Sequence, residues 1–186
     1  MEAFLVSAGA VALAELGDKT QLLALVLAAR FRAPVPVIAG IATAVLANHL
    51  MAGAVGTLLA SFLSPAVLRW LLAASFVVTA IWMLVPDKEP VGEARTARYG
   101  AYGTTVLTFF LVEMGDKTQI ATVALAAKYH ALVPVVAGTT LGMLIADVPA
   151  VLLGRAVAER IPLKLVHRLA AAVFVVLAVL AVLQLR

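Results

Sequence analysis

The chain has 186 residues, of which 64% are hydrophobic and 13% are charged, and its mean hydropathy of +1.09 excludes an ordinary soluble domain. The absence of cysteine excludes disulfides, thiolate metal sites and cysteine nucleophiles. The net charge of +4 comes from basic residues dispersed along the chain, so nucleic acid is not expected as a partner.

Six apolar segments follow one another, each long enough to cross about 30 Å of hydrocarbon as a helix. They cover about 3–29, 35–61, 66–86, 101–127, 133–154 and 165–185. The longest polar connection is the segment 87–100, which leaves no room for a soluble domain. The sequence therefore predicts an all-α integral membrane protein with six transmembrane helices in the lipid bilayer.

The basic residues at the helix ends predict the orientation in the membrane. The first, third and fifth connections contain Arg30, Arg32, Lys88, Arg95, Arg98, Arg155, Arg160, Lys164 and Arg168. The opposite side contains only Arg69, Lys128 and Arg186. Because cytoplasmic loops carry the excess of Lys and Arg, the odd connections are expected in the cytoplasm and both termini outside it.

The chain contains an internal repeat. "ELGDKTQ" at 15–21 returns as "EMGDKTQ" at 113–119, 98 residues later, and the same shift aligns Phe76 with Phe174. Because a unit of three helices crosses the membrane an odd number of times, its two copies must enter the membrane from opposite sides. We therefore expect two inverted repeats, 1–86 and 101–186, joined by a cytoplasmic linker, 87–100. That architecture is typical of secondary transporters with a site at the membrane midplane, although duplicated helix units also occur in channels and scaffolds.

The repeated motif places three charges near the centre of an apolar segment. On insertion scales, three central charges cost one helix roughly 8–10 kcal/mol, so the motif needs partners inside the protein. Glu15 and Lys19 are four residues apart, a spacing that pairs them on one face of a continuous helix, and the second copy repeats the spacing. Gly17 and Gly115 would allow a close helix crossing or a local break that exposes backbone carbonyls as ligands.

Bringing the two motifs together assembles an oxygen-rich cage with a net charge of about −2. Its candidate metal ligands are Glu15, Asp18, Thr20, Gln21, Glu113, Asp116, Thr118 and Gln119. Calcium and manganese accept such oxygen ligands, whereas magnesium sheds water reluctantly and zinc usually recruits His or Cys. Crowded carboxylates should take up protons when the cation leaves, which predicts proton antiport with the cation as cargo and no resident cofactor.

Other polar residues in the apolar segments are candidates for a proton relay or for support of the site: Lys19, Lys117, Asn48, His49 and Asp147. The charges could instead be interhelical packing contacts in a scaffold that transports nothing, with each lysine neutralising an acid of the other motif. A third hypothesis is an exporter of small amino acids or organic cations. Enzymatic motifs such as H-E-x-x-H and G-x-S-x-G are absent from the sequence, so an enzyme is not expected.

The two motif copies resemble the paired E-x-G-D-[KR]-[TS] signatures of the calcium/proton antiporter-2 family, which includes Golgi manganese and calcium exchangers and bacterial manganese exporters. The resemblance implies that Glu15, Asp18, Glu113 and Asp116 carry metal and protons. It also implies export from the cytoplasm driven by inward proton flow. Short loops look like those of a bacterial or archaeal member, in the inner membrane. The sequence allows a homo-oligomer and leaves manganese versus calcium open.

Overall fold

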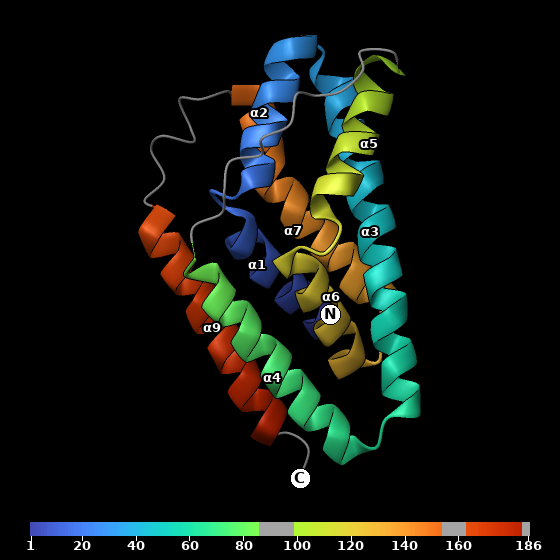
Figure 1. Ribbon diagram of the computed structural model, residues 1–186, viewed down its shortest axis with the longest axis vertical. Coiled ribbons are helices and arrows are strands. Elements are labelled where there is room, and N and C mark those ends of the chain that lie inside the picture. The colour runs from blue at the N-terminus through green and yellow to red at the C-terminus, as the bar shows by residue number, and fades with distance from the viewer. Residues whose placement is uncertain (86–98, 154–162, 184–186) are drawn as a thin grey trace.

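The computed structural model describes residues 1–85, 99–153 and 163–183, and these parts of the chain are helical throughout apart from short connections (Figure 1). The helices are α1 (Glu2–Glu15), α2 (Lys19–Phe31), α3 (Pro34–Phe62), α4 (Pro65–Met83), α5 (Gly100–Glu113), α6 (Lys117–Tyr129), α7 (Leu132–Leu153) and α9 (Leu163–Leu183). The all-α prediction is therefore confirmed for the described residues. The expected linker lies almost wholly outside them, as do six of the twelve basic residues that set the expected orientation.

Four helices are long and apolar enough to cross a membrane on their own: α3, α4, α7 and the Lys164–Leu183 part of α9. Their observed limits lie within a few residues of the predicted segments. Prolines begin two of them, because Pro34 and Pro65 occupy first-turn positions where the missing N–H costs nothing.

The prediction of continuous helices over 3–29 and 101–127 is wrong, and the local break that the glycines allowed is what the structure has. Gly17 (φ 82°) and Gly115 (φ 81°) adopt left-handed backbone that other residues rarely tolerate. The following aspartates are extended, with φ and ψ of −79° and 169° at Asp18 and −77° and 165° at Asp116. Both copies of the motif therefore break the helix in the same way.

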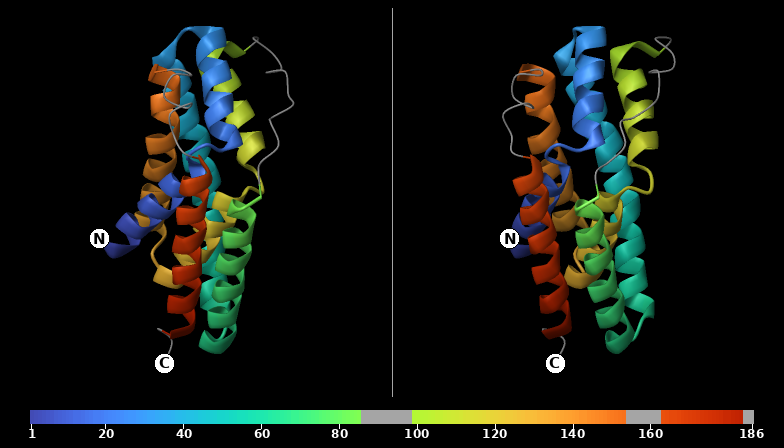
Figure 2. Two further views of the ribbon diagram at one scale, coloured as in Figure 1. Left: turned by 90° about the vertical axis from the view of Figure 1, so that its left-hand side faces the viewer. Right: turned by 60° about the vertical axis from the view of Figure 1, so that its left-hand side comes forward.

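The helices pack in a pattern that pairs elements from the two halves of the chain. Helix α1 packs on α7, α5 packs on α3, α3 crosses α7, and α4 lies along α9. Small residues allow the closest approaches: a Cβ at Gly142 of α7 would lie 2.5 Å from the Ala8 carbonyl oxygen of α1. Figures 1 and 2 show α2 and α5 at one end of the molecule, with α4 and α9 extending along the other end.

Buried apolar side chains form two separate cores. One contains residues of α4 and α9 together with residues of α1 and α6. The other is built from α1, α2, α3, α5 and α7, and among the described residues it receives no buried side chain from α4 or α9. Since the two helix breaks lie where α1 meets α2 and α5 meets α6, the polar motifs sit between these cores.

Candidate functional site

Two ion pairs connect the two helix breaks. The Lys19 ammonium lies 2.5 Å from an Asp116 carboxylate oxygen, and the Lys117 ammonium lies 2.9 Å from one of Asp18. The predicted local pairing of Glu15 with Lys19, and its equivalent in the second copy, is wrong because the helix ends between the two residues. Each lysine instead reaches an acid of the opposite motif, as the packing hypothesis expected, and this leaves both glutamates outside the ion pairs.

The glutamates are held by threonines of their own motifs. Thr20 donates a hydrogen bond to one carboxylate oxygen of Glu15 at 2.8 Å, and Thr118 donates to one of Glu113 at 3.4 Å. The second carboxylate oxygen of each glutamate is buried and accepts no hydrogen bond from the described residues. Each glutamate is therefore held by one hydrogen bond, and its second carboxylate oxygen remains available to bind a ligand.

The two glutamines stabilise the breaks. Gln21 accepts a hydrogen bond from the Gly17 N–H at 3.1 Å, and Gln119 accepts one from the Gly115 N–H at 2.7 Å. Gln21 also donates to the Ala146 carbonyl of α7 at 3.0 Å. Sequence reasoning placed these side chains around a cation and missed this structural role, although the Gly-x-x-x-Gln spacing in both copies is a signal for it.

Three buried carboxylates converge between the breaks. One oxygen from each of Glu15, Glu113 and Asp116 can be chosen so that all three lie within 4.8 Å of one another. We call these three residues the carboxylate cluster. A single cation can contact all of them, because oxygen ligands lie about 2.3–2.6 Å from calcium and slightly closer to smaller ions. The negative C-terminal ends of α1 and α5 and the positive N-terminal ends of α2 and α6 meet at the breaks, so the helix dipoles oppose one another there and the carboxylates dominate the charge of the site.

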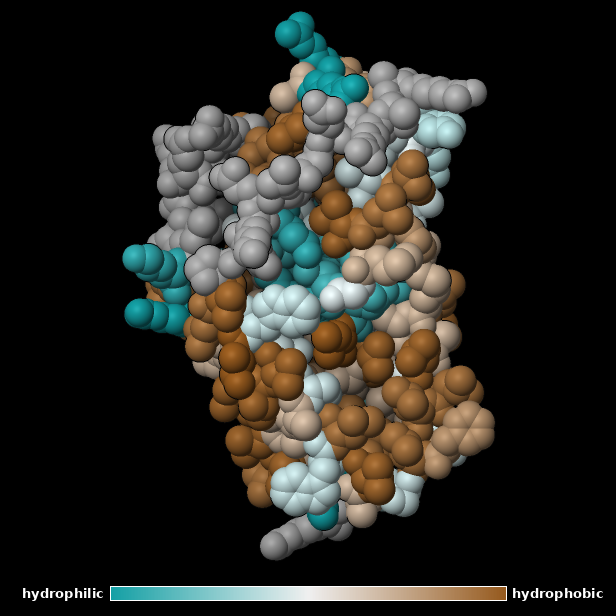
Figure 3. Space-filling view, viewed as in Figure 1, coloured by the Kyte–Doolittle hydropathy of each residue, from teal (hydrophilic) through white to brown (hydrophobic). Residues whose placement is uncertain are grey.

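Access to the two motifs is unequal, although their backbones match. The Lys19 side chain is 21% exposed, whereas the Lys117 side chain is 2% exposed. Figure 3 shows hydrophilic residues gathered across the middle of one face, with hydrophobic surface on the side of α4 and α9. The first motif therefore reaches the molecular surface at Lys19, whereas the carboxylates of both motifs are buried.

The remaining candidates lie on α3 and α7. Asn48 and His49 are buried on α3, and Asn48 donates to the Phe110 carbonyl of α5 at 3.1 Å, which ties these two helices together. Asp147 is buried on α7, next to the Ala146 carbonyl that Gln21 contacts. Among the described residues, His49 is not one of the carboxylate cluster's neighbouring ligand groups, and its Nδ1 has no hydrogen-bond partner.

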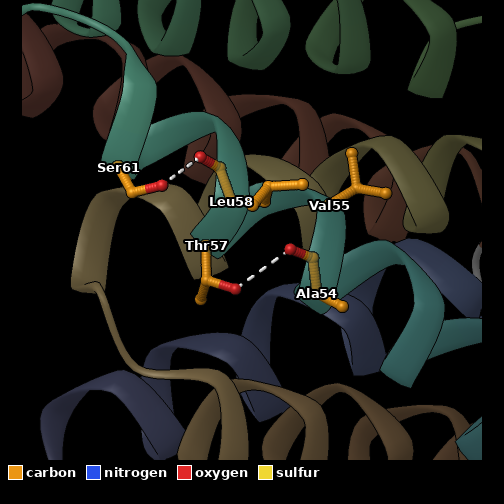
Figure 4. A pocket seen from close by; sticks show the side chains of 5 residues that line it. All are labelled: Ala54, Val55, Thr57, Leu58 and Ser61. Atoms are coloured by element: carbon orange, nitrogen blue, oxygen red, sulfur yellow. Dashed lines mark hydrogen bonds between the residues drawn. The ribbon is translucent and has the colours of Figure 1, made fainter.

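A separate surface groove on α3 lacks the chemistry of a cation site. It is lined by Ala54, Val55, Thr57, Leu58 and Ser61 (Figure 4). The two hydroxyls in it donate to carbonyls of their own helix, from Thr57 to Ala54 at 3.0 Å and from Ser61 to Leu58 at 2.7 Å. The groove has no charged side chain, so the carboxylate cluster is the stronger candidate.

Comparison with known proteins gives consistent matches over nearly the whole chain. The family model described as "Divalent cation/proton antiporter GDT1" matches residues 3–91 and 101–186. A Vibrio cholerae protein named "Putative manganese exporter" is 48% identical over 179 residues, which cover 96% of this chain and 89% of that protein. A GDT1-like protein of Synechocystis is 32% identical over 195 residues and covers 92% of both chains. No solved structure gives a significant match.

Proposed function

This chain belongs to the GDT1 family of divalent cation/proton antiporters, and from that premise we propose that it exports manganese, calcium or both from the cytoplasm in exchange for protons. The cation binds in the carboxylate cluster, with Glu15 and Glu113 as its principal ligands and Asp116 shared with Lys19. The name of the 48% identical relative supports manganese as the first cation to test.

The observation that carries this proposal is the imbalance of charge between the breaks. The two lysines each meet an aspartate, while Glu15 and Glu113 are buried with neither lysine as an ion-pair partner among the described residues. Packing contacts alone would not need more acids than lysines, since every buried carboxylate without a positively charged partner is costly. A dication offsets two negative charges and satisfies the open oxygens of both glutamates.

Exchange with protons follows from competition for the same oxygens. When the cation leaves, two closely spaced carboxylates in a region of low dielectric cannot both stay ionised, so they take up protons. Two protons for one dication would keep the charge of the site unchanged. Thr20 and Thr118 hold one oxygen of each glutamate in either state, so the second oxygen is the one that exchanges its partner.

The proposed architecture is six membrane crossings in two inverted repeats, with α1–α2 and α5–α6 each forming one interrupted crossing. The matching backbone angles at the two breaks support it. Arg30 and Arg32 mark the far end of α2 as cytoplasmic. The proposed export loads the cluster from the cytoplasm of a bacterial cell and carries the cation across its inner membrane.

Cation binding by the purified protein tests the proposal. We expect electron paramagnetic resonance to show saturable Mn²⁺ binding, with calcium as competitor and lysine without effect. Glu15→Gln and Glu113→Gln should each weaken binding by at least about tenfold. Glu2→Gln, the same change at an exposed position of α1, is the matched control and should leave binding unchanged. Displacement of Mn²⁺ by lysine would favour an amino-acid exporter, and absence of Mn²⁺ and Ca²⁺ binding would contradict the proposal.

A further inference from the structure

One buried acid has no role in the site as described so far. Of the five buried carboxylates among the described residues, Glu15 and Glu113 accept hydrogen bonds from threonines, and Asp18 and Asp116 meet lysines. Asp147 is fully buried, and neither of its carboxylate oxygens accepts a hydrogen bond from the described residues. A buried carboxylate without a hydrogen-bond partner is costly, so a bound group that supplies one would be stabilising.

The position of Asp147 connects it to the breaks. The carbonyl of the preceding residue, Ala146, accepts the hydrogen bond from Gln21, so this turn of α7 rests against the first motif. The ion pairs among the described residues join each motif lysine to Asp18 or Asp116, so Asp147 has no ion-pair partner in this part of the chain.

We propose that Asp147 is a further cation-binding residue, which takes part in holding the divalent cation beside the carboxylate cluster. This inference rests on the proposed function. The cluster supplies three carboxylates, whereas calcium accepts six to eight oxygen ligands and manganese about six. The repeat offers no second acid of this kind, because the position 98 residues earlier is His49. Asp147 therefore makes the contributions of the two repeats to the site chemically different.

The variant Asp147→Asn tests this inference, since it keeps the size of the side chain and removes its charge. We expect it to weaken Mn²⁺ binding by at least about tenfold, while the melting temperature of the cation-free protein stays the same or rises. Thr140→Val is the matched control, because Thr140 is a buried polar residue of α7 whose hydroxyl also has no hydrogen-bond partner in the described parts of the chain. It should not change Mn²⁺ affinity.

The outcomes separate the two proposals. If the wild type binds neither Mn²⁺ nor Ca²⁺, the proposed function fails. If the wild type binds Mn²⁺ and Asp147→Asn binds it with the same affinity, only the inference about Asp147 is overturned. A purely structural Asp147 would give that second result together with a lower melting temperature of the cation-free variant.

A second inference comes from the unequal packing of equivalent helices. Helices α4 and α9 pack against α6 and α1, and among the described residues neither packs comparably against α2 or α5. Ala124 of α6 is 3% exposed, whereas Val26, its repeat equivalent on α2, is 56% exposed. Likewise Leu13 of α1 packs against the first core, whereas its equivalent Leu111 of α5 is 59% exposed. Among the described residues, α4 and α9 thus cover faces of α6 and α1 and leave the equivalent faces of α2 and α5 exposed.

We infer that α4 and α9 move together as a pair and, in a second state, cover α2 and α5 instead of α6 and α1. Two copies of one repeat can exchange conformations at little cost, because the same kinds of contact are lost and formed. The contact between α4 and α9 is suited to such a movement. It includes Phe76 and Phe174, which are repeat equivalents, fully buried, with ring centroids 6.2 Å apart.

Distances between spin labels in the reconstituted protein test this movement, and the cysteine-free sequence needs no background mutations. Labels at Val26 of α2 and Val176 of α9 occupy exposed positions and report on the two helices that should approach. We expect a shorter distance population to appear when Mn²⁺ and the pH gradient are varied. Labels at Val77 and Val179 report on α4 and α9 and should keep one distance. An unchanged Val26–Val176 distance in protein that transports Mn²⁺ would overturn the inference.

Discussion

Replacing the two motif lysines by methionine should have very different effects, although the sequence makes them equivalent. Lys117→Met removes the partner of Asp18 from an ion pair in which both side chains are buried, and losing one member of such a pair costs about 3–5 kcal/mol. Lys19 is 21% exposed, so water partly screens its pair with the buried Asp116, and Lys19→Met should cost about 2 kcal/mol, between the values for an exposed and a buried pair. We therefore expect Lys117→Met to lower the free energy of unfolding by about 2 kcal/mol more than Lys19→Met.

Unfolding by sodium dodecyl sulfate in mixed micelles, followed by circular dichroism, measures both variants against the wild type. The double variant Asp18→Asn with Lys117→Met is the control, because removing both members of a buried pair costs far less than removing one. We expect it to recover most of the lost stability. Equal losses for the two lysines, or additive losses in the double variant, would refute the assignment of the buried ion pair.

Other perturbations have equally definite outcomes. Gly17→Ala should cost about 1–2 kcal/mol of unfolding free energy, because φ is 82° there, whereas Gly9→Ala meets nothing within 4 Å and should be neutral or stabilising. Gly56→Ala should destabilise the packing of α3 on α6, since its Cβ would lie 2.2 Å from the Val123 carbonyl oxygen, and thermal unfolding measures the loss. Mn²⁺ affinity should fall as the pH falls, because protons and the cation compete for the same carboxylates, and Glu113→Gln should flatten this dependence in binding titrations.

The long helices were predictable because the bilayer fixes their length. Apolar runs of about 20 residues gave the limits of α3, α4, α7 and α9 to within a few residues. The motif helices were harder, since a break of three residues between Glu15 and Lys19 leaves the apolar run almost intact. A glycine alone is consistent with a close crossing as well as with a break, and only the positive φ at Gly17 decides between them.

The residues of the candidate site were predictable from the repeat, but their pairing was not. The spacing of Glu15 and Lys19 predicts a local ion pair only if the helix continues, so one wrong assumption about the backbone misassigned both lysines. The prediction that the two motifs contain more acids than lysines does not depend on whether the helix continues, because it follows from composition alone. The function of Gln21 as a hydrogen-bonding partner of the break could be seen only after the break itself was known.

The central claim is that the carboxylates between the breaks exchange a divalent cation for protons. Metal-dependent proton flux in proteoliposomes with an imposed pH gradient tests it most directly, with manganese, calcium, magnesium and lysine compared for the wild type and Asp116→Asn. We predict that manganese or calcium moves protons through the wild type and that Asp116→Asn, which inserts normally, does not. If none of these cations drives proton flux through the wild type, or if Asp116→Asn gives the same flux as the wild type, the account is contradicted.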